Sequence, residues 1–342
     1  MTAGSARATA ERSAGLDLLR AVACLLVVAF HLDTVAGIGF GPLDPLIRGG
    51  DDGVYIFFAL SGYLLYRPFI DREVDLRSYA IKRAARILPG YYVALLGLTI
   101  LTGSALPTSH LFQYLTFTAT YSIPLRGFLG SAWTLSAELL FYVTLPLIAR
   151  AARGREIATL AWLALGSVVL AILLRLNLNS STEWLSGSYP FVVYAFVPGM
   201  LLAVVERKHP AAFRRLAATP VPLVGAALIA FGCITSVLPF ALGTGIGTPL
   251  LMGWLLQHRV PGARPLVFLG GASYAMYLWH KDLIIAFGAV GAAFAIVAAG
   301  ASWALVERPI LDRAHGIAKS WGRRAPTEPT SSTGPAIEAP AG

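Results

Sequence analysis

The stretch GLDLLRAVACLLVVAFHLDTVAG, residues 15–37, is apolar over the length of a membrane-crossing helix, yet it carries Asp17, Arg20 and His31. Arg20 and His31 are eleven residues apart. At about 100° per residue they share one helix face, separated by about 16 Å along the axis, and Asp17 lies near that face. Ionisable groups in a membrane helix face a protein interior or an aqueous cavity. The stretch therefore predicts a first spanning helix with a polar path along one side.

The composition is that of a polytopic membrane protein. Of 342 residues, 56% are hydrophobic and 13% are charged, and the mean hydropathy is +0.67. This excludes a soluble domain. The net charge of +9 is explained by basic cytoplasmic loops rather than by binding of nucleic acid. Cys24 and Cys233 both lie in apolar runs, so neither a disulfide framework nor a metal site is predicted.

Apolar runs of spanning length predict an all-α bundle of about ten transmembrane helices in the plasma membrane. They lie at 16–36, 53–70, 88–104, 132–149, 157–174, 189–205, 219–237, 239–257, 266–280 and 284–306. Alternate loops and the two tails hold 22 of the 27 lysines and arginines, which predicts that both termini are cytoplasmic. The predicted organisation is a cytoplasmic tail over 1–15, one membrane domain over 16–312, and a disordered cytoplasmic tail over 313–342.

Two further motifs place charge in or beside apolar runs. In KRAARILPGYY, Arg83 and Arg86 are three residues apart and share a helix face. They are suited either to lipid headgroups or to a phosphate-bearing ligand. In WTLSAELLFY, Glu138 has no basic residue within a turn. It therefore either orients an imidazole or pairs with an arginine.

Three other motifs have a structural interpretation, and the first of them also has a functional one. SYAMYLWH contains Tyr274 and His280, which fit an interfacial aromatic belt or a substrate-binding surface. In FFALSGYLL, Ser61 and Gly62 are small enough for close helix packing. ERP, residues 307–309, is expected to end the last span at its proline.

Taken in order, these motifs resemble the acyltransferase-3 family of integral membrane O-acyltransferases. The resemblance extends from about residue 14 to 312. It rests on the R-x10-H of LDLLRAVACLLVVAFH, on FFALSGYLL, on the R-x-x-R of Arg83 and Arg86, on WTLSAELLFY, on SYAMYLWH and on ERP. The resemblance implies an acyl transfer, expected to be acetyl, from cytoplasmic acyl-CoA to a hydroxyl group. It implies acyl-CoA as co-substrate and no bound cofactor.

The family pattern implies that His31 is the catalytic base and that Arg20, Arg83 and Arg86 bind the donor. Glu138 and Asp17 are further catalytic candidates, and Tyr274 and His280 are candidates for substrate binding. The expected acceptor is a glycan or a glycosylated secondary metabolite such as a macrolide. Two alternatives remain open on the residues: a CoA-independent membrane enzyme, for example an isoprenoid cyclase, and a transporter or flippase, both of which also need intramembrane charges.

Overall fold

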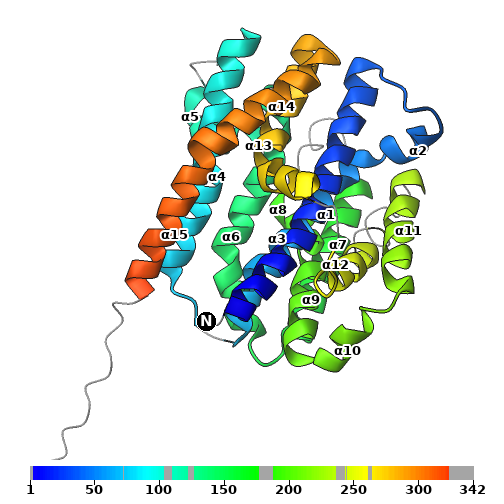
Figure 1. Cartoon of the computed structure of the whole chain (residues 1–342), viewed down its shortest axis with the longest axis vertical. Helices are drawn as coiled ribbons and strands as arrows, with labels where there is room; N and C mark the ends of the chain where they lie inside the picture. The colour runs from blue at the N-terminus through cyan, green and yellow to red at the C-terminus, as the bar shows by residue number, and fades with distance from the viewer. Residues whose placement is uncertain are drawn as a thin grey trace, which may run out of the picture.

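The computed structural model describes residues 3–71, 73–103, 110–121, 127–176, 188–235, 243, 245–260 and 264–322. Within these ranges the chain is helical and contains no strand. The α-helices are α1 (Ala3–Ala36), α2 (Asp44–Ile47), α3 (Gly53–Asp71), α4 (Leu76–Thr102), α5 (Leu111–Leu115), α6 (Trp133–Ala152), α7 (Glu156–Leu176), α8 (Tyr189–Val192), α9 (Val197–Lys208), α10 (Pro210–Arg215), α11 (Pro220–Thr235), α12 (Thr248–Leu255), α13 (Arg264–Phe287), α14 (Val290–Ser302) and α15 (Arg308–Gly322). The fold is thus the predicted all-α helix bundle (Figure 1).

Seven helical segments of the described residues are long and apolar enough to cross a membrane. The apolar helices Pro220–Thr235 and Gly245–Leu255 are shorter, and α13 has 24 residues. Within the described residues each of the ten predicted runs overlaps one of these helices, so the protein is a polytopic membrane protein, and the count of ten spans stays a prediction. Figure 1 places the start of α1, the end of α15 and α10 at one end of the bundle, as expected if both chain ends lie on one side.

Helix crossings at the centre of the bundle depend on glycine. α13 packs along α1 and also contacts α4 and α14. A Cβ atom at Gly270 of α13 would overlap the carbonyl oxygen of Asp17. A Cβ at Gly62 of α3 would likewise overlap the carbonyl oxygen of Phe196, next to α9. The interpretation of Gly62 as a close-packing residue is therefore confirmed.

The C-terminal part of the bundle differs from the prediction. Pro309 does not end the helix. It follows a π-helical turn (Trp303–Glu307) and lies in the first turn of α15, which continues to Gly322. The prediction of disorder from residue 313 is wrong for residues 313–322; residues 323–342 lie outside the described residues. Ala314 and Ala318 are buried, and the carbonyl oxygen of Ala318 accepts a hydrogen bond from Ser78 of α4. Packing against α4 therefore orders this segment.

Candidate active site

Arg20 and Asp17 form an ion pair one turn apart on α1. Both Arg20 and His31 lie on the side of α1 that faces α13, because Arg20 lines a cavity together with Ser273 and Tyr274, and His31 contacts His280. The shared face predicted from the eleven-residue spacing is therefore present. It faces protein and is partly buried, as expected for charged groups in a membrane helix.

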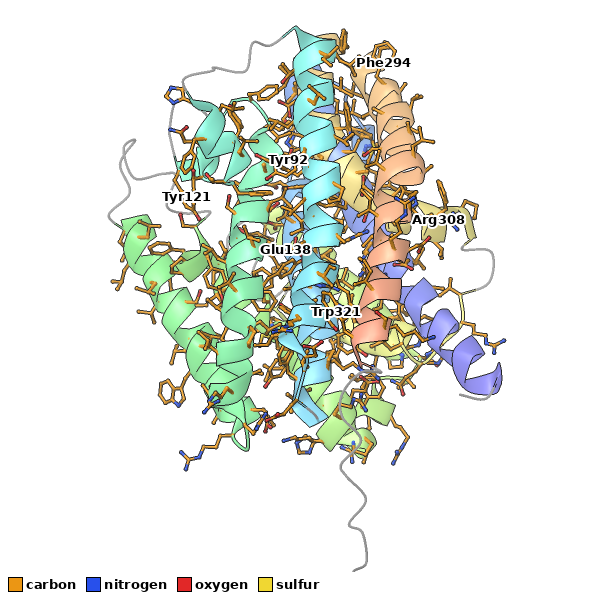
Figure 2. All side chains as sticks on the ribbon, turned by 90° about the vertical axis from the view of Figure 1, so that its left-hand side faces the viewer. Tyr92, Tyr121, Glu138, Phe294, Arg308 and Trp321 are labelled. Atoms are coloured by element: carbon orange, nitrogen blue, oxygen red, sulfur yellow. The ribbon has the colours of Figure 1, made fainter. Side chains whose placement is uncertain are left out.

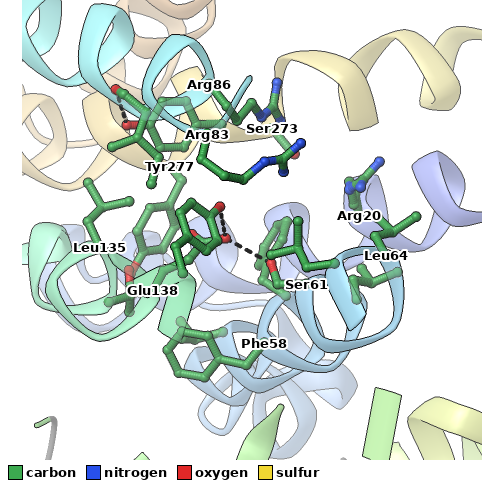
Figure 3. A pocket seen from close by; sticks show the side chains of 18 residues that line it. Arg20, Phe58, Ser61, Leu64, Arg83, Arg86, Leu135, Glu138, Ser273 and Tyr277 are labelled. Atoms are coloured by element: carbon green, nitrogen blue, oxygen red, sulfur yellow. Dashed lines mark hydrogen bonds between the residues drawn. The ribbon is translucent and has the colours of Figure 1, made fainter. Parts of the chain in front are cut away.

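A cavity of about 110 Å³ brings together most of the predicted polar residues. Figure 3 shows Arg20 reaching it from α1, Ser61 from α3, Arg83 and Arg86 from α4, and Glu138 from α6. The remaining wall is largely apolar and aromatic, with Leu64, Leu135, Tyr142, Tyr274 and Tyr277 among its members. Five helices therefore combine three cations and one carboxylate in a partly apolar space.

Arg83 and Arg86 carry positive charge that no carboxylate neutralises directly. Within the described part of the chain, neither has a carboxylate oxygen within 4.0 Å, and Nε of Arg83 is buried without a hydrogen-bond partner. The Cζ atom of Arg83 lies 5.8 Å from the ring centre of Tyr142, and that of Arg86 lies 5.6 Å from the ring centres of Tyr274 and Trp303. Aromatic faces stabilise a cation without consuming its hydrogen bonds. The two guanidinium groups are thus prepared for an anionic ligand.

Glu138 is held by hydroxyl groups rather than by cations. Its Oε1 accepts hydrogen bonds from Oγ of Ser61 at 2.8 Å and from the hydroxyl of Tyr142 at 2.6 Å (Figure 3). Among the described residues it has neither an imidazole partner nor an ion pair, so both sequence interpretations of Glu138 are wrong in their stated form. Ser61 and Tyr142 were not predicted as site residues, although Tyr142 lies one helical turn after Glu138, a spacing that places both on one face.

His31 lies outside this cavity and pairs with His280. Nε2 of His280 lies 3.2 Å from Nδ1 of His31. Nδ1 of His280 faces the carbonyl oxygens of Met276 and Tyr277, at 3.1 and 2.9 Å, and Nδ1 of His31 faces that of Val27 at 2.9 Å. Because a carbonyl only accepts hydrogen bonds, the proton of each neutral ring resides on Nδ1. Nε2 of His31 is then left with its lone pair available for a proton.

The side chain of Tyr277 adjoins both the cavity and the histidine pair. Tyr277 lines the cavity, and its ring centre lies 5.8 Å from that of His280. Its hydroxyl donates to the carbonyl oxygen of Ser131 at 3.0 Å and accepts from Oγ1 of Thr134 at 3.1 Å. His280 is fully buried, so the interpretation as an interfacial aromatic belt does not hold for it. Proximity of His31 and His280, 249 positions apart, had no local sequence signal.

The sequence matches the acyltransferase-3 family, described as an acyltransferase domain, over residues 13–306. This chain belongs to the acyltransferase-3 family.

Curated relatives of the acyltransferase cover most of its length. Exopolysaccharide production protein ExoZ of Rhizobium meliloti is 30% identical over 77% of this chain and 90% of its own. Acyltransferase MdmB of Streptomyces mycarofaciens is 28% identical over 80% of this chain and 79% of its own. Peptidoglycan O-acetyltransferase OatA of Listeria monocytogenes is 26% identical over 79% of this chain and 49% of its own, so the acyltransferase spans about half of that protein. No solved structure matches the acyltransferase.

Proposed function

We propose that the acyltransferase moves an acyl group, expected to be acetyl, from cytoplasmic acyl-CoA to a hydroxyl of a glycan or of a glycosylated secondary metabolite such as a macrolide. The observation that carries the proposal is the cavity that Arg20, Arg83 and Arg86 line together. Among the described residues, Arg83 and Arg86 have no ion-pair partner there. We further propose that the enzyme resides in the plasma membrane, with both termini in the cytoplasm.

The donor fits this cavity by charge and by polarity. Arg83 and Arg86 offer forked donors to phosphate oxygens, and their aromatic neighbours leave those donors free to bind. Arg20, which is ion-paired with Asp17, adds a third cation to the cavity from α1. The apolar wall suits the uncharged arm that joins the phosphates of CoA to its thioester.

The histidine pair supplies the proposed base. Nε2 of His31 takes the proton of the acceptor hydroxyl and the oxygen attacks the thioester carbonyl. The C–S bond then breaks, and the imidazolium of His31 returns the proton to the sulfur, so that CoA leaves as the thiol. His280 acts as a positioning residue, because its Nε2 accepts from Nδ1 of His31 and so keeps Nε2 of His31 unprotonated. Transfer through an acyl-histidine is a second form of the same reaction.

The distance between the arginine-lined cavity and the histidine pair sets a requirement for the reaction. Arg20 and His31 are about 16 Å apart along α1, a distance comparable to an extended pantetheine arm. A thioester held by the arginines has to pass Tyr277, which adjoins both the cavity and His280, to reach His31. We infer that Tyr277 changes position as substrate binds.

The relatives support a hydroxyl acceptor. One is named a peptidoglycan O-acetyltransferase and another an exopolysaccharide production protein. The family match favours acyl transfer over a CoA-independent enzyme or a transporter.

The deciding experiment uses the purified full chain with acetyl-CoA that is labelled in its acetyl group, and a panel of glycan and macrolide acceptors. We expect acceptor-dependent CoA release together with labelled ester. Absence of acceptor-dependent CoA release and of labelled ester with every acceptor of the panel, or movement of the acceptor across vesicles without acylation, would contradict the proposal.

A further inference from the structure

A second hollow lies on the side of the bundle, between α4 and α6, next to the charged cavity. Its volume is about 320 Å³. We call it the lateral groove; α4 lines it with Ala80, Ala84 and Leu88, and α6 with Leu139, Val143 and Pro146. Arg83, Tyr79 and Tyr142 supply its few polar atoms. The groove is thus an apolar space that ends at residues of the candidate site.

The groove exists because α4 and α6 are held apart. Their backbones make few close approaches, although the two helices stand side by side at the surface, with Glu138 labelled between them in Figure 2. Side chains bridge the gap: the hydroxyl of Tyr79 donates to the carbonyl oxygen of Tyr142 at 3.0 Å, and Arg83 lies against the Tyr142 ring. Ala80 and Ala84, one turn apart on α4, are both exposed. Larger side chains there would fill the groove.

The groove and the charged cavity meet at the same three residues. Arg83, Ile87 and Tyr142 line both of them. On the outer side, Val143 is 66% exposed, on a helix whose apolar length suits a membrane. A compound dissolved among lipid chains would therefore reach the cavity by passing Arg83, Ile87 and Tyr142, without crossing an aqueous phase.

We propose that the lateral groove admits an uncharged, lipophilic hydroxyl compound from the bilayer and holds its apolar body while its polar end lies in the cavity. This inference rests on the proposed function, because it assigns the groove to the acceptor. A donor with several phosphates cannot pass the apolar lining without losing its hydration. At the inner end, Ser61 and Glu138 present oxygens that hydrogen-bond the polar end of such an acceptor, and the reacting hydroxyl is the one that reaches Nε2 of His31 once Tyr277 moves.

The experiment uses an octyl glucoside with a photoactivatable diazirine in its alkyl chain, and the full-length protein in lipid nanodiscs. We expect photolabelling within 76–88 and 139–146 that excess unlabelled octyl glucoside abolishes. Ala84→Trp narrows the groove from α4, and Val143→Trp narrows it from α6. Both should lose this labelling and raise the KM for octyl glucoside about tenfold, with the KM for acetyl-CoA unchanged.

The matched control is Ala161→Trp, the same substitution at an exposed position of α7, which should behave as wild type. Labelling that persists in both groove variants, or that octyl glucoside does not displace, would show that the groove holds only bulk lipid and would overturn the proposal. A changed preference among acetyl-, butyryl- and octanoyl-CoA, with an unchanged KM for octyl glucoside, would assign the groove to the donor chain and overturn it as well. Photolabelling needs no turnover, so a wild-type protein that labels in the groove but transfers no acyl group refutes the proposed function alone.

Discussion

At the scale of single residues, the chemistry of His31 depends on a partner from the other end of the chain. His280 has both ring nitrogens engaged, one with backbone carbonyls and one with His31. A ring held in this way cannot itself accept a further proton without breaking a contact. His31, which is only half-buried, has no such contact at Nε2 among the residues that the structure describes. We therefore propose that His31 is the member of the pair that takes up the proton.

Replacement of His31 tests this assignment. In His31→Ala the rate of acyl transfer should fall by about 10²–10⁴-fold, the usual contribution of a general base. Thermal stability and affinity for CoA should stay near wild type, because the arginines proposed to hold CoA line the cavity and His31 lies outside it. The same three measurements on His315→Ala, which changes an exposed histidine of α15, provide the control. A folded His31→Ala protein with wild-type activity would leave Glu138 or Asp17 as the base.

The arginines of α4 give a second prediction at this scale. Arg83→Ala or Arg86→Ala should weaken acyl-CoA binding by about 1.5–3 kcal/mol, the value of a charge-assisted hydrogen bond. Lysine should restore only part of it, because it lacks the planar fork. Isothermal titration with CoA measures the effect, and Arg77→Ala, at the exposed start of α4, serves as control. If both variants bind CoA as wild type does, Arg83 and Arg86 do not hold the donor.

At the scale of elements, the crossing of α1 and α13 positions both parts of the site. The same two helices carry Arg20 and Tyr274 at the cavity and His31 and His280 at the pair. Their close approach at Gly270 sets the register between them. A change of register would therefore disturb the cavity and the histidine pair together.

Gly270→Ala tests the importance of this crossing. The added methyl group would collide with backbone, and overpacking of this kind costs about 1–3 kcal/mol. We expect a lower Tm and a lower kcat. Gly300→Ala in α14 meets no atom within 4 Å and should keep or raise the Tm, because alanine favours helix by about 1 kcal/mol. Equal Tm values for the two variants would show that α1 and α13 can separate at no cost.

Sequence patterns predicted the elements well where apolar runs were uninterrupted. They failed at the end of α13, which was expected near residue 280 because Lys281 and Asp282 interrupt the run. The helix continues to Phe287, since Asp282 is buried with its Oδ1 accepting the backbone N–H of Leu129 at 2.8 Å. That tertiary contact has no local signal. The same holds for the pairing of His31 with His280, whereas the grouping of Arg20, Arg83 and Arg86 was implied by the family resemblance.

At the scale of the whole molecule, the distribution of basic residues predicts the orientation in the membrane. Single cysteines introduced at Ser320 in α15 and at Thr116 beside α5 probe opposite ends of the bundle in Figure 1. Cys24 and Cys233 are buried and free, so the wild-type chain supplies the background measurement. In intact cells an impermeant maleimide should label Thr116→Cys and not Ser320→Cys. Labelling of Ser320→Cys from outside would reverse the orientation.

The buried Tyr277 has a consequence for the cell that houses the enzyme. A protein with a charged cavity and an ionisable pair in one bundle risks becoming a conduit for protons. Each elementary charge that crosses at 100 mV dissipates about 2.3 kcal/mol of stored energy. The aromatic ring, held through its hydroxyl by Ser131 and Thr134, adjoins both the cavity and His280 and places an apolar body beside the path between them. We expect the enzyme to act as an electrical insulator for this reason, so that the membrane can hold its voltage around it.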